Sequence, residues 1–129
     1  MLEVTTADLR LFLHVLAATI WVGGQITLGA LVPALRGFEG VTKVAARRYN
    51  LVAWPAFAVL VLTGIWNITG GDMGDAAQRT LEVKLVFVVL SGVAALLHTR
   101  AKSKAGLAVW GALGVVGALA ALFFGVQLG

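Results

Sequence analysis

Apolar residues dominate four long stretches of this chain, and polar residues gather in the short segments between them. The stretches cover residues 9–35, 51–69, 81–98 and 105–127. A helix needs about 20 residues to cross a hydrocarbon core of about 30 Å. In lipid each stretch must be helical, because an open strand would leave its backbone groups unpaired. The pattern predicts an all-α integral membrane four-helix bundle, formed as a single transmembrane domain over residues 1–129.

Local signals indicate where two of these helices begin and where one bends. Thr5 precedes Asp8 by three residues, which is the spacing of a capping box at a helix start. Asp75 and Gln78 have the same spacing before the third stretch. Pro55 lies inside the second stretch and predicts a kink, because proline removes a helical hydrogen bond.

Composition excludes most classes of soluble protein. Hydrophobic residues make up 60% of the chain and charged residues only 12%, about half the charged fraction of a typical soluble domain. The absence of cysteine excludes disulfides and thiolate metal sites. No nucleophile–base pair, phosphate-binding loop or carboxylate pair appears, so we identify no catalytic residues and expect neither a hydrolase nor a kinase.

The basic residues are distributed unevenly along the chain. Seven of the ten lie in the gaps after the first and third stretches: Arg36, Lys43, Arg47, Arg48, Arg100, Lys102 and Lys104. The positive-inside rule places these gaps in the cytoplasm and both termini outside. Membrane orientation therefore explains the formal net charge of +4, and no nucleic-acid partner is expected.

The first stretch contains one ionisable residue in an oily sequence, His14 in "FLHVLAATIWVGG". Three further residues share its helical face: Ala18, Trp21 and Gln25. A polar stripe on a membrane helix should face protein rather than lipid. Burial favours the uncharged imidazole, which can donate a lone pair to iron or copper. His14 could equally form a plain hydrogen bond to a neighbouring helix, and this alternative stays open.

The other stretches add candidate partners for this histidine. In the second stretch, Trp66 and Asn67 are expected at the depth of His14. The third stretch has a polar stripe at a spacing of seven, Lys84, Ser91 and His98, with Lys84 toward the outer end and His98 toward the inner end. About 21 Å of helix separates these two, so His14 and His98 should not share one metal ion in a monomer. Lys84 could also extend to the outer surface as an interfacial anchor, and His98 could be purely structural.

The fourth stretch has no ionisable group after Lys104. Its small residues follow a helical spacing: Gly114, Ala118, Ala121 and Gly125. Small residues let helix backbones approach closely in membranes. This stretch is therefore expected to be a packing strut or a dimer face.

Three segments resemble a known family in the right order. "LHVLAATIWVGG" resembles the first membrane helix of the CopD-type copper resistance domain, "RRYNLVAWPAFAVLVLTGIW" the second and "LEVKLVFVVL" the third. The related HemJ-type protoporphyrinogen oxidases have the same first-helix histidine and third-helix lysine. The resemblance covers roughly residues 9–99 and implies a small multi-pass protein of the bacterial plasma (inner) membrane that handles heme or copper. It implies His14 as the ligand and Lys84 as its partner in the site.

Three functions follow as hypotheses. The first is a b-type heme bound through His14 in a homodimer, for electron transfer to a redox partner or for porphyrin processing. Side chains expected to line the heme or pair with its propionates are Phe12, Trp21, Trp66, Lys84 and Arg10. The second is copper binding or transport, with an outward-facing site that uses His14 and Met73. The third is a structural membrane subunit without a cofactor.

Overall fold

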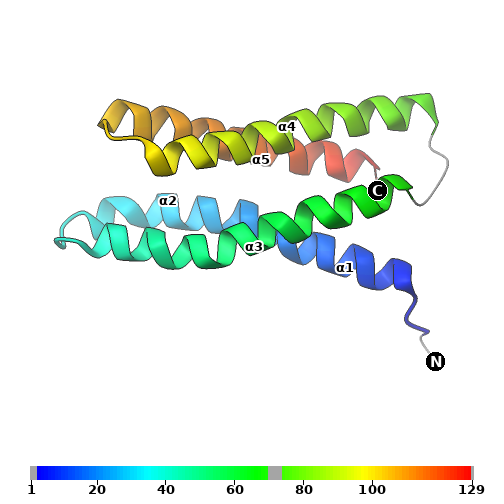
Figure 1. Ribbon diagram of the computed structural model, residues 1–129, viewed down its shortest axis with the longest axis horizontal. Coiled ribbons are helices and arrows are strands. Elements are labelled where there is room, and N and C mark those ends of the chain that lie inside the picture. Colours follow the sequence, from blue (N-terminus) through cyan, green and yellow to red (C-terminus); the bar gives the residue numbers. More distant parts are fainter. Residues whose placement is uncertain (1–2, 70–73, 129) are drawn as a thin grey trace. The chain divides into compact units, whose positions relative to one another are not determined.

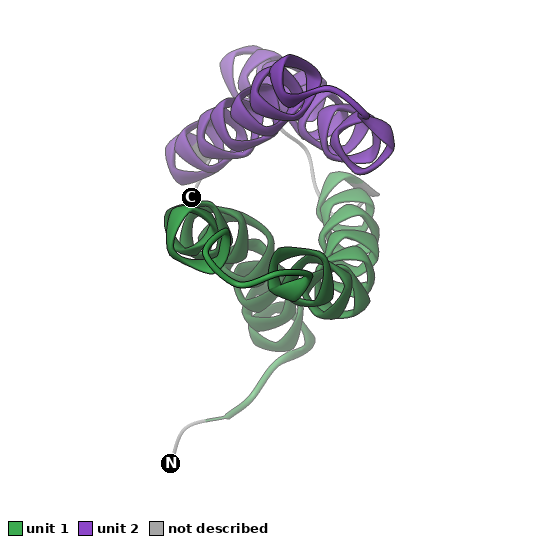
Figure 2. Ribbon diagram, turned by 90° about the vertical axis from the view of Figure 1, so that its left-hand side faces the viewer, with its two compact units in different colours: residues 1–71 green, residues 72–129 purple. Residues whose placement is uncertain are grey.

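The structure is a computed structural model that describes residues 3–69 and 74–128. All regular structure in these residues is helical (Figure 1). Four helices are long and apolar enough to cross a membrane: Thr6–Leu35, Val41–Ile68, Asp75–Arg100 and Lys104–Gln127. The predicted all-α fold class with four membrane-length helices is therefore confirmed. The chain divides into two compact units, Met1–Gly71 and Asp72–Gly129 (Figure 2).

The first helix of unit 1, α1 (Thr6–Ala18), begins at the predicted capping box. The Thr5 hydroxyl accepts a hydrogen bond from the Asp8 amide at 3.2 Å, and Asp8 Oδ2 accepts one from the Thr5 amide at 2.9 Å. These bonds satisfy amides that have no partner inside the helix, and a cap of this kind is worth about 0.5–2 kcal/mol. The sequence signal for this helix start is confirmed.

A short π-helix, η1 (Thr19–Gly23), joins α1 to α2 (Gly24–Leu35). The Trp21 carbonyl oxygen in η1 accepts two side-chain hydrogen bonds, from Gln25 Nε2 at 3.0 Å and from the Tyr49 hydroxyl at 3.3 Å. A π-helical turn holds more residues than an α-helical turn, so it changes which side chains face inward on either side of it. This segment was not predicted, because the hydrophobic pattern runs through it without a break.

The second long helix, α3 (Val41–Thr69), begins well before the apolar stretch that identified it. Gly40 ends the preceding loop with φ of +75°, a left-handed conformation that glycine adopts at little cost. Lys43, Arg47 and Arg48 are consequently helical and exposed, rather than part of a loop. Hydropathy marks only the part of a helix that lies in lipid, whereas helical hydrogen bonding continues through the polar turns before it. The helix also continues past Pro55, and the kink expected there stays a prediction.

Helix α3 runs antiparallel to α1 and α2 within unit 1 (Figure 1). Four contacts follow one register along the pair: Arg10 with Trp66, His14 with Thr63, Trp21 with Phe57, and Gly24 with Tyr49. Small buried residues separate these layers, namely Ala17, Ala53 and Ala56. The small residues allow close backbone approach, and the larger side chains between them determine the register.

Gly24 and its neighbour Gly23 provide a test of this packing. A Cβ atom at Gly24 would lie 2.5 Å from Tyr49 Cε2, whereas one at Gly23 would have nothing within 4 Å. We expect Gly24→Ala to lower the free energy of unfolding by about 1–3 kcal/mol, because the Tyr49 ring must move away from the Trp21 carbonyl. Gly23→Ala should be neutral or stabilising by up to about 1 kcal/mol. Unfolding in detergent, followed by circular dichroism, measures both, and equal effects would contradict the assigned register.

Unit 2 is a hairpin of α4 (Asp75–Arg100) and α5 (Lys104–Leu128). The N-cap of α4 is Gly74, which makes no side-chain capping hydrogen bond, so the capping box expected at Asp75 and Gln78 is wrong. Asp75 is already the first helical residue and therefore cannot act as the cap. Its carboxylate still lies in the first turn, where the helix dipole favours negative charge.

Close packing joins α4 to α5. Ser91 is only 1% exposed, and its hydroxyl donates to the Gly114 carbonyl at 3.1 Å. A Cβ atom at Gly117 would lie 3.2 Å from the Ser91 amide nitrogen and 3.3 Å from the Phe87 carbonyl oxygen. The small-residue stripe of the fourth stretch thus meets α4 at Gly114 and Gly125, and Ala118 and Ala121 are buried. The stripe is a packing strut, and α4 occupies the position that a second subunit would need.

Large apolar side chains point outward from every long helix. The most exposed within the spans include Leu11, Phe12, Leu51, Leu62, Val86 and Phe123. Such a surface would be unfavourable in water but matches the acyl chains of a bilayer. Phe12, expected to line a heme pocket, is 60% exposed and belongs to this outward surface.

Candidate functional site

His14 lies half-buried on α1, and its ring contacts a hydroxyl group on α3. Its Nδ1 atom is 2.8 Å from Oγ1 of Thr63, a side chain that is 5% exposed. The same Thr63 oxygen lies 2.7 Å from the Val59 carbonyl oxygen and 3.2 Å from that of Leu60. The threonine side chain therefore links the imidazole to the backbone of α3.

Counting protons along this link assigns the tautomer of His14. The Thr63 hydroxyl has one hydrogen, and a carbonyl oxygen can only accept, so the 2.7 Å contact uses that hydrogen on Val59. The Thr63 oxygen must then accept from the imidazole, which requires a hydrogen on Nδ1 of His14. In a neutral imidazole this puts the lone pair on Nε2. Metal-binding histidines commonly have the same arrangement, with the other ring nitrogen donating its hydrogen to a nearby acceptor.

Backbone without a side chain lies beside the imidazole ring. A Cβ atom added at Gly64 would be 3.9 Å from His14 Cε1, an ordinary van der Waals contact. The ring thus contacts Thr63 through Nδ1 and approaches the Gly64 position with its Cε1 edge. The hydrogen bond to Thr63 orients the imidazole, and the glycine at position 64 leaves space beside its Cε1 edge.

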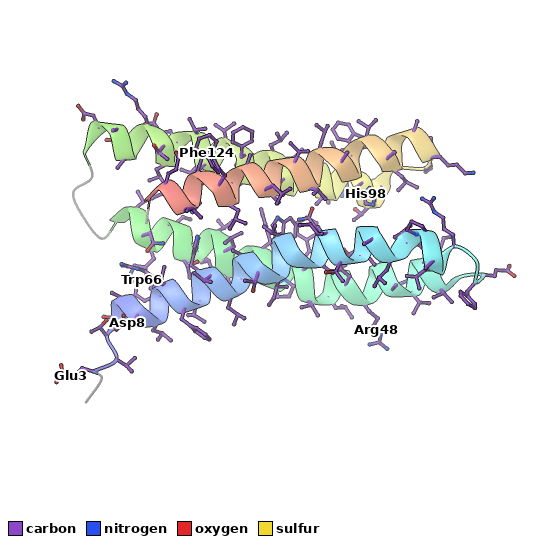
Figure 3. All side chains as sticks on the ribbon, turned by 180° about the vertical axis from the view of Figure 1, so that it is seen from behind. Glu3, Asp8, Arg48, Trp66, His98 and Phe124 are labelled. Carbon is purple, nitrogen blue, oxygen red and sulfur yellow. The ribbon has the colours of Figure 1, made fainter. Side chains whose placement is uncertain are left out.

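A cation and an aromatic ring lie about one turn from His14. The Arg10 guanidinium carbon is 5.7 Å from the centre of the Trp66 ring, which is within range of a cation–π interaction. Arg10 Nε is buried and has no hydrogen-bond partner in the described part of the chain. Figure 3 shows Trp66 near the amino-terminal end of α1, where Asp8 is labelled. The structure thus brings Arg10, His14 and Trp66 together at one end of unit 1, as the sequence analysis expected.

Trp21 occupies a different layer of the same unit. It is 3% exposed, and its ring centre lies 4.5 Å from that of Phe57 and 5.4 Å from that of Trp54. Seven residues of helix separate it from His14, which corresponds to about 10 Å. Trp21 is therefore a buried core residue within the π-helix, whereas the imidazole contacts Thr63.

Thr63 is the residue at this site that the sequence analysis did not select. Trp66 and Asn67 were the residues expected at the level of His14, and the structure shows Asn67 exposed. The sequence did place a hydroxyl residue, Thr63, one helical turn before Trp66. A threonine that hydrogen-bonds only to its own helix can occupy the same position, so this spacing alone could not identify a partner for His14. Only the pairing of α1 with α3 distinguishes the two.

The polar stripe of α4 faces α5 inside unit 2, as a polar stripe on a membrane helix should. Half-buried Lys84 lies against Gly125, where an added Cβ would be 3.2 Å from its Nζ atom. His98 donates from Nδ1 to the Leu107 carbonyl at 2.8 Å (Figure 3). That bond ties the end of α4 to the start of α5, which agrees with a structural role for His98.

Side chains that commonly bind metal ions are not clustered in the described residues. Neither segment, 3–69 or 74–128, contains a group of three or more His, Cys, Asp or Glu side chains that could hold one. Met73, expected to share a copper ion with His14, lies outside the described residues.

Comparisons with known proteins leave the family assignment untested. No family model, curated protein or solved structure matches this chain. The resemblance to the CopD-type and HemJ-type proteins therefore remains a prediction from the sequence.

Proposed function

We propose that this chain is a multi-pass protein of the bacterial plasma membrane that binds b-type heme through Nε2 of His14. The observation that supports the proposal is the contact of His14 Nδ1 with Thr63, whose own hydrogen is used on Val59. This arrangement favours the tautomer that a heme ligand needs and restrains the ring. A histidine that only accepted a hydrogen bond through Nδ1 would carry its hydrogen on Nε2 and could not use that nitrogen as a ligand.

The surrounding residues fit the other needs of a heme. Arg10 offers guanidinium hydrogens for a propionate, since its Nε atom has no hydrogen-bond partner in the described residues. Trp66 provides a flat apolar surface beside Arg10. In a homodimer, His14 of a second copy of the chain would help to hold the same heme. Heme would supply one-electron redox chemistry for electron transfer, or a bound porphyrin would be the molecule processed.

Two alternatives use the same histidine differently. Copper could take the Nε2 lone pair, but copper sites usually combine several nitrogen or sulfur ligands. A structural subunit would use the bond from His14 to Thr63 only to tie α1 to α3, a contribution of about 0.6–2 kcal/mol in membranes.

An absorption spectrum of the purified protein separates the three functions. Protein produced with ample heme supply and purified in mild detergent should show a Soret band that shifts on reduction. Copper found by metal analysis without porphyrin would support the copper alternative. A colourless protein that also fails to take up added hemin, and that contains no copper, would leave the structural subunit.

The role of Thr63 can be tested by comparing two replacements. Thr63→Val keeps the shape but removes the hydroxyl, whereas Thr63→Ser keeps the hydroxyl. We expect Thr63→Val to weaken heme retention about 10–100-fold, the usual effect of removing a group that orients a metal-bound histidine. Thr63→Ser should remain near the wild type. Hemin titration measures both, and equal retention by the two variants would contradict a positioning role for the hydroxyl.

A further inference from the structure

The first turns of α3 present a cationic group in line with the lipid-facing surface of the helix. Arg48 is exposed, and Figure 3 shows its side chain pointing away from the helices of its unit. Exposed residues follow it on the same face at helical spacing: Leu51, Val52, Pro55, Val59 and Leu62. Leu51, one turn after the arginine, is 67% exposed. A guanidinium thus stands at the head of a continuous apolar track.

The length of this track matches one leaflet of a bilayer. Fourteen residues of helix separate Arg48 from Leu62, which corresponds to about 21 Å. Half of a hydrocarbon core of about 30 Å is shorter than this, so one acyl chain can lie along the track with the headgroup at Arg48. The track therefore has the shape of a phospholipid, with a polar site at one end and an apolar surface along its length.

Charge selects an anionic headgroup. The segment from Arg36 to Arg48 contains four basic residues and one acid, Glu39, so its net charge is +3. Arg47 lies next to Arg48, and both are exposed. Two further exposed apolar residues, Val41 and Val44, flank this charge and suit the boundary between headgroups and acyl chains. Two guanidinium groups should bind an anionic headgroup better than a zwitterionic one, because the ammonium group of a zwitterionic headgroup is repelled by the guanidinium charges.

We propose that Arg48, with Arg47, binds the phosphate of an anionic phospholipid whose acyl chain lies along Leu51, Pro55 and Leu62. This site is separate from His14, because it lies at the amino-terminal end of α3 and His14 contacts α3 at Thr63. The proposal does not depend on heme or copper.

Native mass spectrometry of the full chain in detergent provides the test, with phosphatidylglycerol and phosphatidylcholine of the same acyl chains as probes. We expect the wild type to bind phosphatidylglycerol at least about tenfold more tightly than phosphatidylcholine. The double variant Arg47→Gln/Arg48→Gln should lose about tenfold in phosphatidylglycerol affinity. The control variant Lys102→Gln/Lys104→Gln removes the same charge from exposed positions at the other basic gap. It should change the phosphatidylglycerol affinity less than about twofold.

Two further probes make the outcome decisive. Inorganic phosphate in millimolar excess should not displace the lipid, because it has no acyl chain for the track. Displacement by phosphate would show an anion site without a lipid track and would overturn the proposal. Equal losses of affinity in the two double variants would show that only net charge matters, and would overturn the proposal. Equal binding of the two lipids would show that the headgroup is not selected, and would overturn it as well. Unchanged helicity of both variants by circular dichroism shows that lost affinity is not lost folding.

Discussion

Replacing His14 with alanine is expected to abolish the Soret band of the purified protein and to reduce bound heme to background. The variant removes the proposed axial nitrogen, while Thr63 keeps its own bond to the Val59 carbonyl. The lost link between the helices costs about 0.6–2 kcal/mol, which is small beside the about 5–15 kcal/mol that stabilises a typical folded protein. The variant should therefore fold, and its loss of heme should reflect the ligand alone. Absorption spectra and pyridine hemochrome analysis measure the effect.

His98→Ala is the matched control for this experiment. It also removes one imidazole, but that ring is tied to the Leu107 carbonyl in unit 2. We expect His98→Ala to keep the heme content and reduction behaviour of the wild type. Heme retained by His14→Ala would refute the proposed ligand, and heme lost only from His98→Ala would move the site to unit 2.

Gly117→Leu is expected to produce the largest loss of stability among single replacements in unit 2. A Cβ atom there already meets backbone atoms of Ser91 and Phe87 at 3.2–3.3 Å, and leucine adds three more carbons beyond it. Backbone atoms of a helix cannot rotate away as a side chain can, so α4 and α5 must separate. We expect the free energy of unfolding to fall by about 3 kcal/mol, the upper end for an overpacked core.

Gly29→Leu is the control for Gly117→Leu, because a Cβ atom at Gly29 has nothing within 4 Å. That variant should be neutral or stabilised by up to about 1 kcal/mol, since glycine is a poor helix former. Thermal unfolding in detergent, followed by circular dichroism, compares the two. A Gly117→Leu protein as stable as the wild type would mean that the close approach of α4 and α5 is not required.

Much of the fold could be predicted because lipid imposes simple requirements on a chain. Backbone groups in hydrocarbon must pair within their own helix, so each apolar stretch had to be a helix. The capping box at Thr5 and Asp8 was also predictable, since it depends only on neighbours in sequence. The polar stripe of Lys84, Ser91 and His98 was recognised from its spacing alone, and the structure shows that it faces α5.

The candidate site was predictable only in part. His14, Arg10 and Trp66 were chosen from their residue types and depth, and the structure brings them together. Trp21 was chosen from the same helical face, but it lies two turns further along the helix, where it packs with Trp54 and Phe57. The capping box predicted at the start of α4 was wrong. The spacing of Asp75 and Gln78 matches such a box, but Gly74 is the N-cap and Asp75 is the first helical residue.

By itself, the amino-acid sequence determined four membrane-length helices, the basic gaps between them and the positions of the two histidines. Each of these follows from local composition, since hydropathy and charge act through the solvent around each residue. The tertiary structure alone decided that His14 meets Thr63, whose contacts with the Val59 carbonyl favour an imidazole hydrogen on Nδ1. That outcome depends on the register of α1 and α2 against α3, which is set by the packing of residues distant in sequence, such as Gly24 of α2 against Tyr49 of α3.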